Sequence, residues 1–316
     1  MKPSLIVGNN GQDGTLLSRL LQERGVNFMG LGRNGLVDAN GQLLQAGELT
    51  DPAFIGDLVR SIQPSRVYYL AAHHHSSQDA ALSKKTDLWT PSFQVQVLGL
   101  VHLLDALRLH CRDARLFYAA SSHIFGSPEE EPQTESTPFH PVNIYGVTKL
   151  MGIEACRYHQ RQYGLFTSVG ILYNHESVLR PENFLSQKII RGALAIKEKR
   201  STRLVLGDLL AEVDWGYAPD YVDAMVRILD LDQPGDYVIA TGKRHTVREF
   251  VQLVFEQLDL DYREWVGEDP SIIQKSKNRL VGDSAKLRRE TGWSPSVSFP
   301  EMVRLLVTQT KATSPS

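Results

Sequence analysis

The sequence is poor in cysteine and has no excess of charge of either sign. Its two cysteines, Cys111 and Cys156, stand far apart and make neither a metal-ligand nor a redox spacing. The 34 lysines and arginines nearly balance the 36 aspartates and glutamates, which leaves a formal net charge of -2 at pH 7. No overall basic field is therefore available to bind nucleic acid or an anionic membrane.

Long apolar runs are also missing. The chain has no stretch of about 18 uncharged apolar residues that would cross a membrane, and no apolar signal-peptide segment follows its first residues. We therefore expect a cytoplasmic protein that has neither nucleic acid nor a membrane as a partner. With 316 residues, 42% of them hydrophobic, it is long enough for one large domain or two packed ones.

What the sequence does contain is an alternation of short apolar runs and longer amphipathic stretches. This βαβ rhythm predicts an α/β fold, a Rossmann doubly wound parallel sheet covered on both faces. The predicted strands are 4–7, 27–31, 66–70, 115–119, 167–172 and 237–240. Helices are predicted at 91–109 and 142–163, the first with one buried face made by Phe93, Val97, Leu100, Leu103, Leu104 and Leu107.

The rhythm breaks after Asn174, where polar residues and a basic helix follow. The break predicts a smaller, mainly C-terminal substrate-binding lobe. We assign residues 1–173 and 214–246 to a dinucleotide-binding domain. Residues 174–213 and 247–316 would then form the lobe that binds the substrate.

A glycine-rich turn follows the first predicted strand directly. Gly8, Gly11 and Gly14 have the spacing G-x-x-G-x-x-G and lead into a helix. Glycines let the backbone turn tightly and approach a pyrophosphate, which the free N–H groups at a helix start can bind. A tight turn without a ligand is the alternative, but the position between the first strand and the first helix favours a dinucleotide site.

The end of the second predicted strand bears on the choice of cofactor. An NAD enzyme usually carries an acidic residue there for the ribose 2′-hydroxyl, whereas this chain has Arg33. A guanidinium suits a 2′-phosphate, so the sequence favours NADP, with NAD as the alternative and a solvated loop arginine as the plain interpretation. Glu48 is placed to face the adenine, and Asp51 is a predicted helix cap.

Tyr145 and Lys149 are four residues apart and therefore share one face of a predicted helix. An ammonium group stabilises a phenolate, so we expect the pKa of Tyr145 to fall from about 10 toward working pH, which suits a group that exchanges a proton with a hydroxyl. Tyr-x-x-x-Lys alone is common. Ser121, at the carboxyl edge of a predicted strand, makes the combination specific.

These motifs resemble those of an extended short-chain dehydrogenase/reductase, in particular the GDP-mannose 4,6-dehydratases of the NAD-dependent epimerase/dehydratase family. The similarity covers nearly the whole chain. It rests on residues 8–14, 70–72, 137–149 and 170–177, and on the later stretches 214–216, 220–222, 239–242 and 247–250.

The resemblance implies a closed redox cycle. Tyr145 would take the proton of the sugar 4-hydroxyl during oxidation at C4. A base would then remove the proton at C5, C6 would lose its hydroxyl as water, and reduction at C6 would leave the cofactor unchanged. The expected dinucleotide-binding residues are Gly8, Asn10, Gly11, Gln12, Asp13, Gly14, Arg33, Glu48, Leu49, Leu70, Ala71, Ala72, Tyr145, Lys149 and Leu172.

One departure from the family bears on the chemistry. The family places an acidic residue two positions after the catalytic Ser or Thr, as base at C5 and acid toward the C6 hydroxyl, whereas this chain has His123. Imidazole can do both near pH 7, with the charge reversed. Catalysis by Ser121, His123, Tyr145 and Lys149 therefore fits a dehydratase. A 4-keto reductase, C4 dehydrogenase or C4 epimerase, and a binding protein without catalysis, stay open as alternatives.

The expected substrate is GDP-mannose or a related nucleotide sugar. The family has an arginine immediately before Asp214, where this chain has Val213, and we expect other basic residues to compensate. The expected substrate-binding residues are His75, Ser122, Asn174, Glu176, Lys188 and Arg279, with Arg180 as a further candidate.

Two further expectations concern metals and assembly. The run His73-His74-His75 is not expected to bind a metal, because consecutive side chains of an extended segment point in opposite directions. A homodimer through the predicted helices 91–109 and 142–163 is implied by the resemblance. The segment 35–41 lacks the arginine and serine run that reaches a neighbouring subunit in the dehydratases, so a tetramer is not implied.

Overall fold

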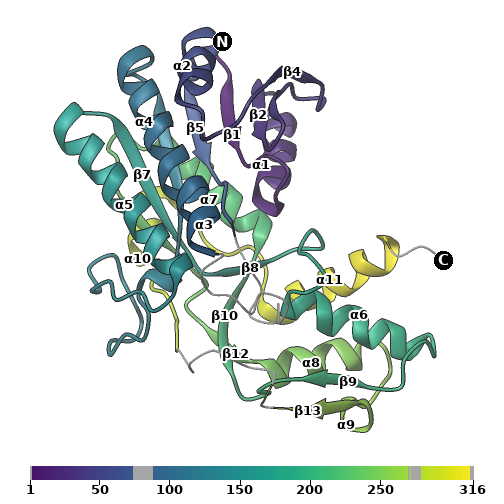
Figure 1. Cartoon of the computed structure of the whole chain (residues 1–316). Coiled ribbons are helices and arrows are strands. Elements are labelled where there is room, and N and C mark those ends of the chain that lie inside the picture. Colours follow the sequence, from purple (N-terminus) through teal and green to yellow (C-terminus); the bar gives the residue numbers. More distant parts are fainter. Residues whose placement is uncertain (1, 74–87, 270, 272–278, 314–316) are drawn as a thin grey trace.

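The structure is a computed structural model that describes residues 2–73, 88–269, 271 and 279–313. Within these ranges eight strands form one sheet in the order β11-β7-β6-β5-β1-β2-β3-β4, in which β11 through β2 are parallel (Figure 1). The strands are β1 Ser4–Val7, β2 Phe28–Gly32, β3 Gly35–Val37, β4 Leu43–Ala46, β5 Arg66–Tyr69, β6 Arg115–Ser121, β7 Phe166–Leu172 and β11 Asp236–Ile239. The predicted Rossmann sheet is confirmed, because each apolar run forms a buried strand.

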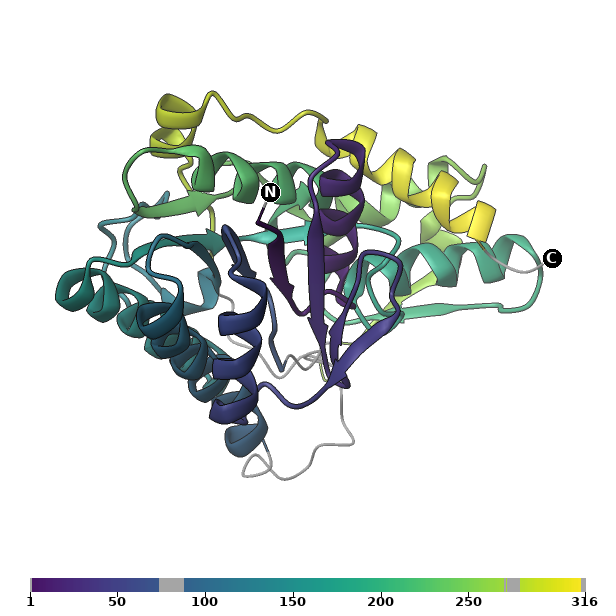
Figure 2. The ribbon, with the colours of Figure 1, turned by 90° about the horizontal axis from the view of Figure 1, so that it is seen from above.

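Alternating side chains of the strands pack on two layers of helices. On β1, Leu5 and Val7 join one core cluster and Ile6 joins the other. The first cluster lies beneath α2 (Pro52–Ile62), α4 (Gly99–His110) and α5 (Ile144–Tyr163), and the second beneath α1 (Gln12–Glu23), α7 (Ala218–Asp230) and α10 (Ala285–Thr291). Figure 2 shows the two layers on opposite sides of the sheet. The order of the strands reverses at β1, which puts a ligand crevice at their carboxyl ends.

The predicted helix 91–109 is interrupted. It consists of α3 (Trp89–Phe93), the π-helical turn η2 (Gln94–Leu98) and α4. A π turn contains one more residue than an α turn and so rotates the helix face. For that reason Phe93, expected in the core, is 39% exposed, while the other five residues of the predicted apolar face are buried.

A third core cluster lies apart from the sheet, at the lower right of Figure 1. We call the elements around it the smaller lobe: β9 Leu204–Leu206, β13 Val266–Glu268, α6 Leu185–Lys197, α8 Val247–Glu256, α9 Tyr262–Trp265 and α11 Phe299–Thr313. A three-stranded sheet joins it to the main sheet through β8 (Asn174–Glu176), β10 (Glu212–Tyr217) and β12 (Arg244–Thr246). None of the described helices is long and apolar enough to cross a membrane.

Candidate active site

A cavity of about 1100 Å³ opens at the carboxyl ends of the central strands. Its wall includes the ends of β1, β2, β5, β6 and β7, together with β8 and the start of α6. A typical small-molecule cavity has roughly 300–1,000 Å³, so this one is as large as the upper end of that range.

The glycine-rich turn forms one end of this cavity, and its glycines are required by geometry. Gly8 has φ of +91°, and a Cβ there would lie 2.7 Å from the Ala71 nitrogen. A Cβ on Gly14 would lie 2.3 Å from the Gly8 carbonyl oxygen. No described side chain caps α1, so its first N–H groups remain available to an anion.

The expected dinucleotide-binding residues all lie on the cavity wall: Gly8, Asn10, Gly11, Gln12, Asp13, Gly14, Arg33, Glu48, Leu49, Leu70, Ala71, Ala72, Tyr145, Lys149 and Leu172. Arg33 stands in the tight turn between β2 and β3, where it is exposed. Asp51 caps α2 as predicted, since its carboxylate accepts hydrogen bonds from the N–H groups of Ala53 and Phe54.

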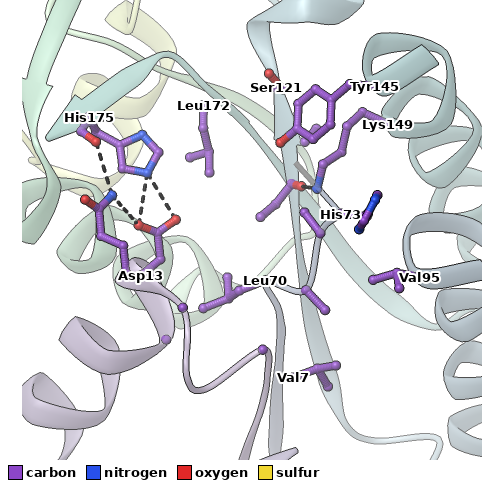
Figure 3. A pocket seen from close by; sticks show the side chains of 18 of the residues that line it. Val7, Asp13, Leu70, His73, Val95, Ser121, Tyr145, Lys149, Leu172 and His175 are labelled. Atoms are coloured by element: carbon purple, nitrogen blue, oxygen red, sulfur yellow. Dashed lines mark hydrogen bonds and ion pairs between the residues drawn. The ribbon is translucent and has the colours of Figure 1, made fainter. Parts of the chain in front are cut away.

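Ser121, Tyr145 and Lys149 come together on one side of the cavity (Figure 3). Ser121 ends β6, while Tyr145 and Lys149 occupy successive turns of α5. The Lys149 side chain is buried, and its Nζ donates a hydrogen bond of 2.6 Å to the Ala119 carbonyl oxygen. Its Nζ lies 5.6 Å from the centre of the Tyr145 ring.

The expected lowering of the Tyr145 pKa is not found. Burial raises the pKa of Tyr145 to about 12, against a smaller lowering by Arg180. The Lys149 ammonium does not offset this, because burial also lowers the pKa of Lys149 to about 7 and its Nζ is bound to the backbone. The prediction counted the attraction between the two groups but not the loss of solvent around both.

Asp13 and His175 form an ion pair on the other side of the cavity (Figure 3). His175 Nε2 lies 3.0 Å from both carboxylate oxygens, and its ring stacks on Tyr221 with 4.6 Å between ring centres. Burial raises the pKa of Asp13, but His175, Arg180 and Gln12 outweigh it and lower that pKa to about 2. Gln12 also donates to the His175 carbonyl oxygen and accepts from Ser177.

Asp13 is an expected dinucleotide-binding residue and His175 lies in the motif at 170–177, but the pair between them is not predicted from the sequence. The two partners are 162 residues apart in the chain, so no local spacing connects them. As a result, the first turn of α1 is bound directly to the segment that begins at β8.

Gln96 is a second feature that the sequence analysis missed. Its side chain is fully buried, donates a 2.6 Å hydrogen bond to the Thr148 hydroxyl and accepts a 3.1 Å bond from the His73 N–H. The neighbouring Val95 carbonyl accepts a hydrogen bond from the Tyr69 hydroxyl. The π turn is thereby fastened to the helix that carries Tyr145.

The expected substrate residues divide into three groups. Ser122, Asn174 and Glu176 line the cavity, and so do Arg180 and the catalytic candidate His123. In the described ranges, the structure does not bring Lys188 or Arg279 to the cavity wall; the Arg279 side chain is 71% exposed and 3.8 Å from Glu212. His75 lies outside the described residues.

Known proteins match this chain over nearly its full length. A family model described as GDP-mannose 4,6 dehydratase matches residues 5–306. GDP-mannose 4,6 dehydratase 2 of Arabidopsis thaliana is 36% identical over 327 residues, covering 97% of this chain and 86% of the relative. The protein of the same name in Caenorhabditis elegans is 34% identical over 344 residues, covering 97% of this chain and 88% of the relative.

Solved structures agree on the fold. The structure of RMD from Pseudomonas aeruginosa complexed with NADPH has a TM-score of 0.82 at 22% identity and covers 98% of this chain and 99% of its own. The dTDP-glucose 4,6-dehydratase of Bacillus anthracis in complex with NAD has a TM-score of 0.82 at 17% identity, with 99% and 97% covered. The fold is thus shared with these proteins, and the sequence matches go further: this chain belongs to the GDP-mannose 4,6-dehydratase family.

Proposed function

We propose that this chain is an NADP-dependent nucleotide-sugar 4,6-dehydratase that acts on GDP-mannose. The observation that carries the proposal is the convergence of Ser121, Tyr145 and Lys149 with the glycine-rich turn on one cavity, in a chain of this family. A volume of about 1100 Å³ supports simultaneous binding of a dinucleotide and a nucleotide sugar.

The residues present fit a nicotinamide dinucleotide. Gly8 and Gly14 allow a close approach of the backbone, and the uncapped start of α1 suits a pyrophosphate. Leu49, Leu70 and Leu172 give the wall apolar surface for the rings. An oxidised nicotinamide dinucleotide supplies such a site with a hydride acceptor and a positive charge.

In the proposed first step, Tyr145 exchanges a proton with the sugar 4-hydroxyl, and Ser121 orients that oxygen. At rest Tyr145 keeps its proton, since burial raises its pKa to about 12. A positive charge close to the ring would favour the phenolate. Lys149, one turn further along α5 and buried, is positioned to supply that charge when it is protonated.

Dehydration then requires removal of the C5 proton, which the new C4 carbonyl makes acidic, and departure of the C6 hydroxyl as water. His123 lines the cavity, and we assign this step to it because it stands two positions after Ser121, where the family has its acidic residue. A reaction that stops at C4, as in a reductase, dehydrogenase or epimerase, is the second candidate. It is favoured by the hydrogen bond between His123 and Asn143, which occupies one ring nitrogen.

Incubation with GDP-mannose and NADP tests the proposed function. We expect a 6-deoxy-4-keto product without net formation of NADPH, because the reducing equivalents removed at C4 return at C6. Product can be followed by mass spectrometry and NADPH by absorbance. Net NADPH formation would select a C4 dehydrogenase or reductase, and a C4 epimer without net NADPH would select an epimerase. Saturable NADP binding without turnover of any nucleotide sugar would leave only a binding protein.

The choice of NADP over NAD is tested at Arg33. Arg33 is exposed at the cavity rim and, within the described ranges, forms no ion pair, so its guanidinium is available for a 2′-phosphate. We expect Arg33→Asp to weaken NADPH binding by about tenfold or more while NADH binding holds or improves, as a lost charged hydrogen bond costs about 1.5–3 kcal/mol. Fluorescence titration with both dinucleotides measures this.

A matched control is Arg19→Asp, which makes the same change of charge on an exposed part of α1 that does not line the cavity. It should leave the ratio of the two dissociation constants unchanged. An unaltered ratio in Arg33→Asp as well would contradict the proposed contact with the 2′-phosphate.

The homodimer and the cytoplasmic location stay predictions. The dimer is supported by exposed apolar side chains on the helices expected to form it: Trp89 and Phe93 of α3, Leu109 of α4, and Met151 and Tyr158 of α5. Large exposed apolar side chains on neighbouring helices are typical of a surface that a partner covers.

A further inference from the structure

Tyr118 packs against Lys149, between β6 and α5. It is fully buried, and its hydroxyl donates a hydrogen bond of 3.5 Å to the backbone carbonyl oxygen of Lys149. The Nζ atom of the same lysine lies over the Tyr118 ring, 5.1 Å from the ring centre. One buried phenol therefore adjoins both the backbone and the ammonium group of Lys149.

The place of this phenol is determined by its neighbours. A Cβ on Gly152 of α5 would lie 2.1 Å from the Tyr118 hydroxyl oxygen, so α5 can lie this close to the phenol only because residue 152 is a glycine. The Tyr69 ring also packs on it, with 6.0 Å between ring centres. In a closely packed core, this leaves the Tyr118 ring little room to turn away from the ammonium group.

Three described neighbours of the ammonium group can favour its charge. The Ala119 carbonyl oxygen accepts its 2.6 Å hydrogen bond, and the rings of Tyr118 and Tyr145 have their centres at 5.1 and 5.6 Å. A cation within about 6 Å of a ring centre is attracted to the negative ring face, most strongly where water is excluded. Burial acts in the opposite direction and lowers the pKa of Lys149 to about 7, against a smaller rise caused by Asp13.

The two rings differ in their part in the proposed reaction. Tyr145 lines the cavity and exchanges a proton there, so the charge on its ring changes. Tyr118 does not line the cavity. Burial raises the pKa of Tyr118 well above its usual value, so this phenol stays neutral throughout. Tyr118 thus offers Lys149 an attraction that is the same before and after proton exchange.

We propose that Tyr118 is a positioning residue whose ring face holds the Lys149 ammonium group in place beside Tyr145. Because a neutral amine is not attracted to the ring in this way, the ring also favours the charged form of Lys149. The contact between ring and ammonium does not depend on the reaction catalysed. Its catalytic meaning rests on the proposed function, in which the positive charge favours the phenolate of Tyr145.

Other titratable groups face the same cavity as Lys149. They are Asp13 on α1, His73 after β5, His123 after β6 and Tyr145 on α5. A substitution at position 118 changes none of them. A difference between variants in the titration of Lys149 therefore reports the loss of the ring.

Tyr118→Leu provides the test, and the conservative variant Tyr118→Phe keeps the ring without its hydroxyl. In cofactor-free protein labelled with ¹³C-lysine, the Cε signals follow the titration of each lysine, and Lys149→Met assigns the signal. We expect a midpoint near pH 7 in the parent and in Tyr118→Phe, and one about one pH unit lower in Tyr118→Leu. Equal midpoints in all three proteins would overturn the proposal, whether or not the protein turns over any nucleotide sugar.

A second replacement tests the ring face without a change of shape. Trifluorophenylalanine in place of Tyr118 fills nearly the same space as phenylalanine, but its fluorine atoms withdraw electrons from the ring face. It should therefore fold as Tyr118→Phe does and lower the midpoint of Lys149 relative to that variant. A midpoint equal to that of Tyr118→Phe would show that the ring only fills space, which contradicts the proposal.

The catalytic meaning is tested by single-turnover oxidation of GDP-mannose with NADP across the pH range. Below both midpoints Lys149 is charged in every variant, so the rates should agree. Above them, Tyr118→Leu should be slower by up to about tenfold, whereas Tyr118→Phe should follow the pH dependence of the parent. An equal loss of rate at every pH would indicate a merely structural role. No turnover in any variant, with the midpoint still shifted, would refute the proposed function and leave the contact between ring and ammonium standing.

Discussion

Replacing Tyr145 by phenylalanine should lower kcat for oxidation at C4 by about 10²–10⁴-fold, the usual contribution of a positioned acid or base. The ring would remain in the cavity wall, so dinucleotide binding should change little. In the proposed reaction the phenol exchanges the proton with the substrate hydroxyl, and within the described residues Ser121, His123 and Lys149 are the other expected catalytic groups that line the cavity near it. Single-turnover measurement with GDP-mannose and NADP isolates this step.

Tyr158→Phe is the matched control, because Tyr158 lies on the same helix and is 47% exposed, away from the cavity. It should leave the single-turnover rate at the parent value. If Tyr145→Phe also kept that rate, Tyr145 would not be the proton-transfer group and the proposed chemistry would be wrong.

Replacing Lys149 by methionine should reduce activity and, at the same time, stabilise the cofactor-free protein below about pH 7. Burial lowers the pKa of Lys149 to about 7, well below its value of about 10.4 in an unfolded chain. Between these values the unfolded chain binds a proton that the folded chain does not. The free energy of unfolding of the parent therefore rises with pH across this range, by an amount on the order of a few kcal/mol.

Methionine removes this dependence because it has no charge to bury. The variant should be more stable than the parent below pH 7, apart from about 1 kcal/mol for the lost hydrogen bond to Ala119, and the difference should shrink toward pH 10. Urea unfolding between pH 6 and 9.5 measures the slope. Lys243 is exposed, so Lys243→Met should show the same slope of the free energy of unfolding against pH as the parent. If Lys149→Met also showed that slope, Lys149 would not be the source of the pH dependence.

Sequence and structure agree where the determinants are local. The strand at Ser4–Val7 and the turn from Gly8 to Gly14 follow from residues that are neighbours in the chain, and so does the pairing of Tyr145 with Lys149 on one helix face. In each of these cases the type and spacing of residues determine both the element and the side chain's place on it.

The features that the sequence did not predict depend on tertiary contacts. The Asp13–His175 pair joins residues from β8 and α1, and the amide of Asn143 meets a histidine 20 residues earlier in the chain. The pKa of Tyr145 depends on how deeply the fold buries it, which residue spacing does not reveal. Likewise, the apolar period of this segment is that of an ordinary α-helix and does not predict the π turn at Gln94–Leu98. The exposed side chain of Phe93 shows in the structure that the helix face is rotated there.

The contacts of Asp13 and Gln12 with the segment from His175 to Ser177 also affect how ligands enter. They join the glycine-rich turn to the segment that begins at β8, on the proposed nucleotide-sugar side of the cavity. Hinge opening between the two halves would have to break the hydrogen bonds between His175 and the Asp13 carboxylate, which is costly when a buried polar group is left without its partner. In the proposed enzyme, exchange of both ligands through the mouth of the cavity is therefore the less costly route, and release of the second ligand need not wait for the halves to separate.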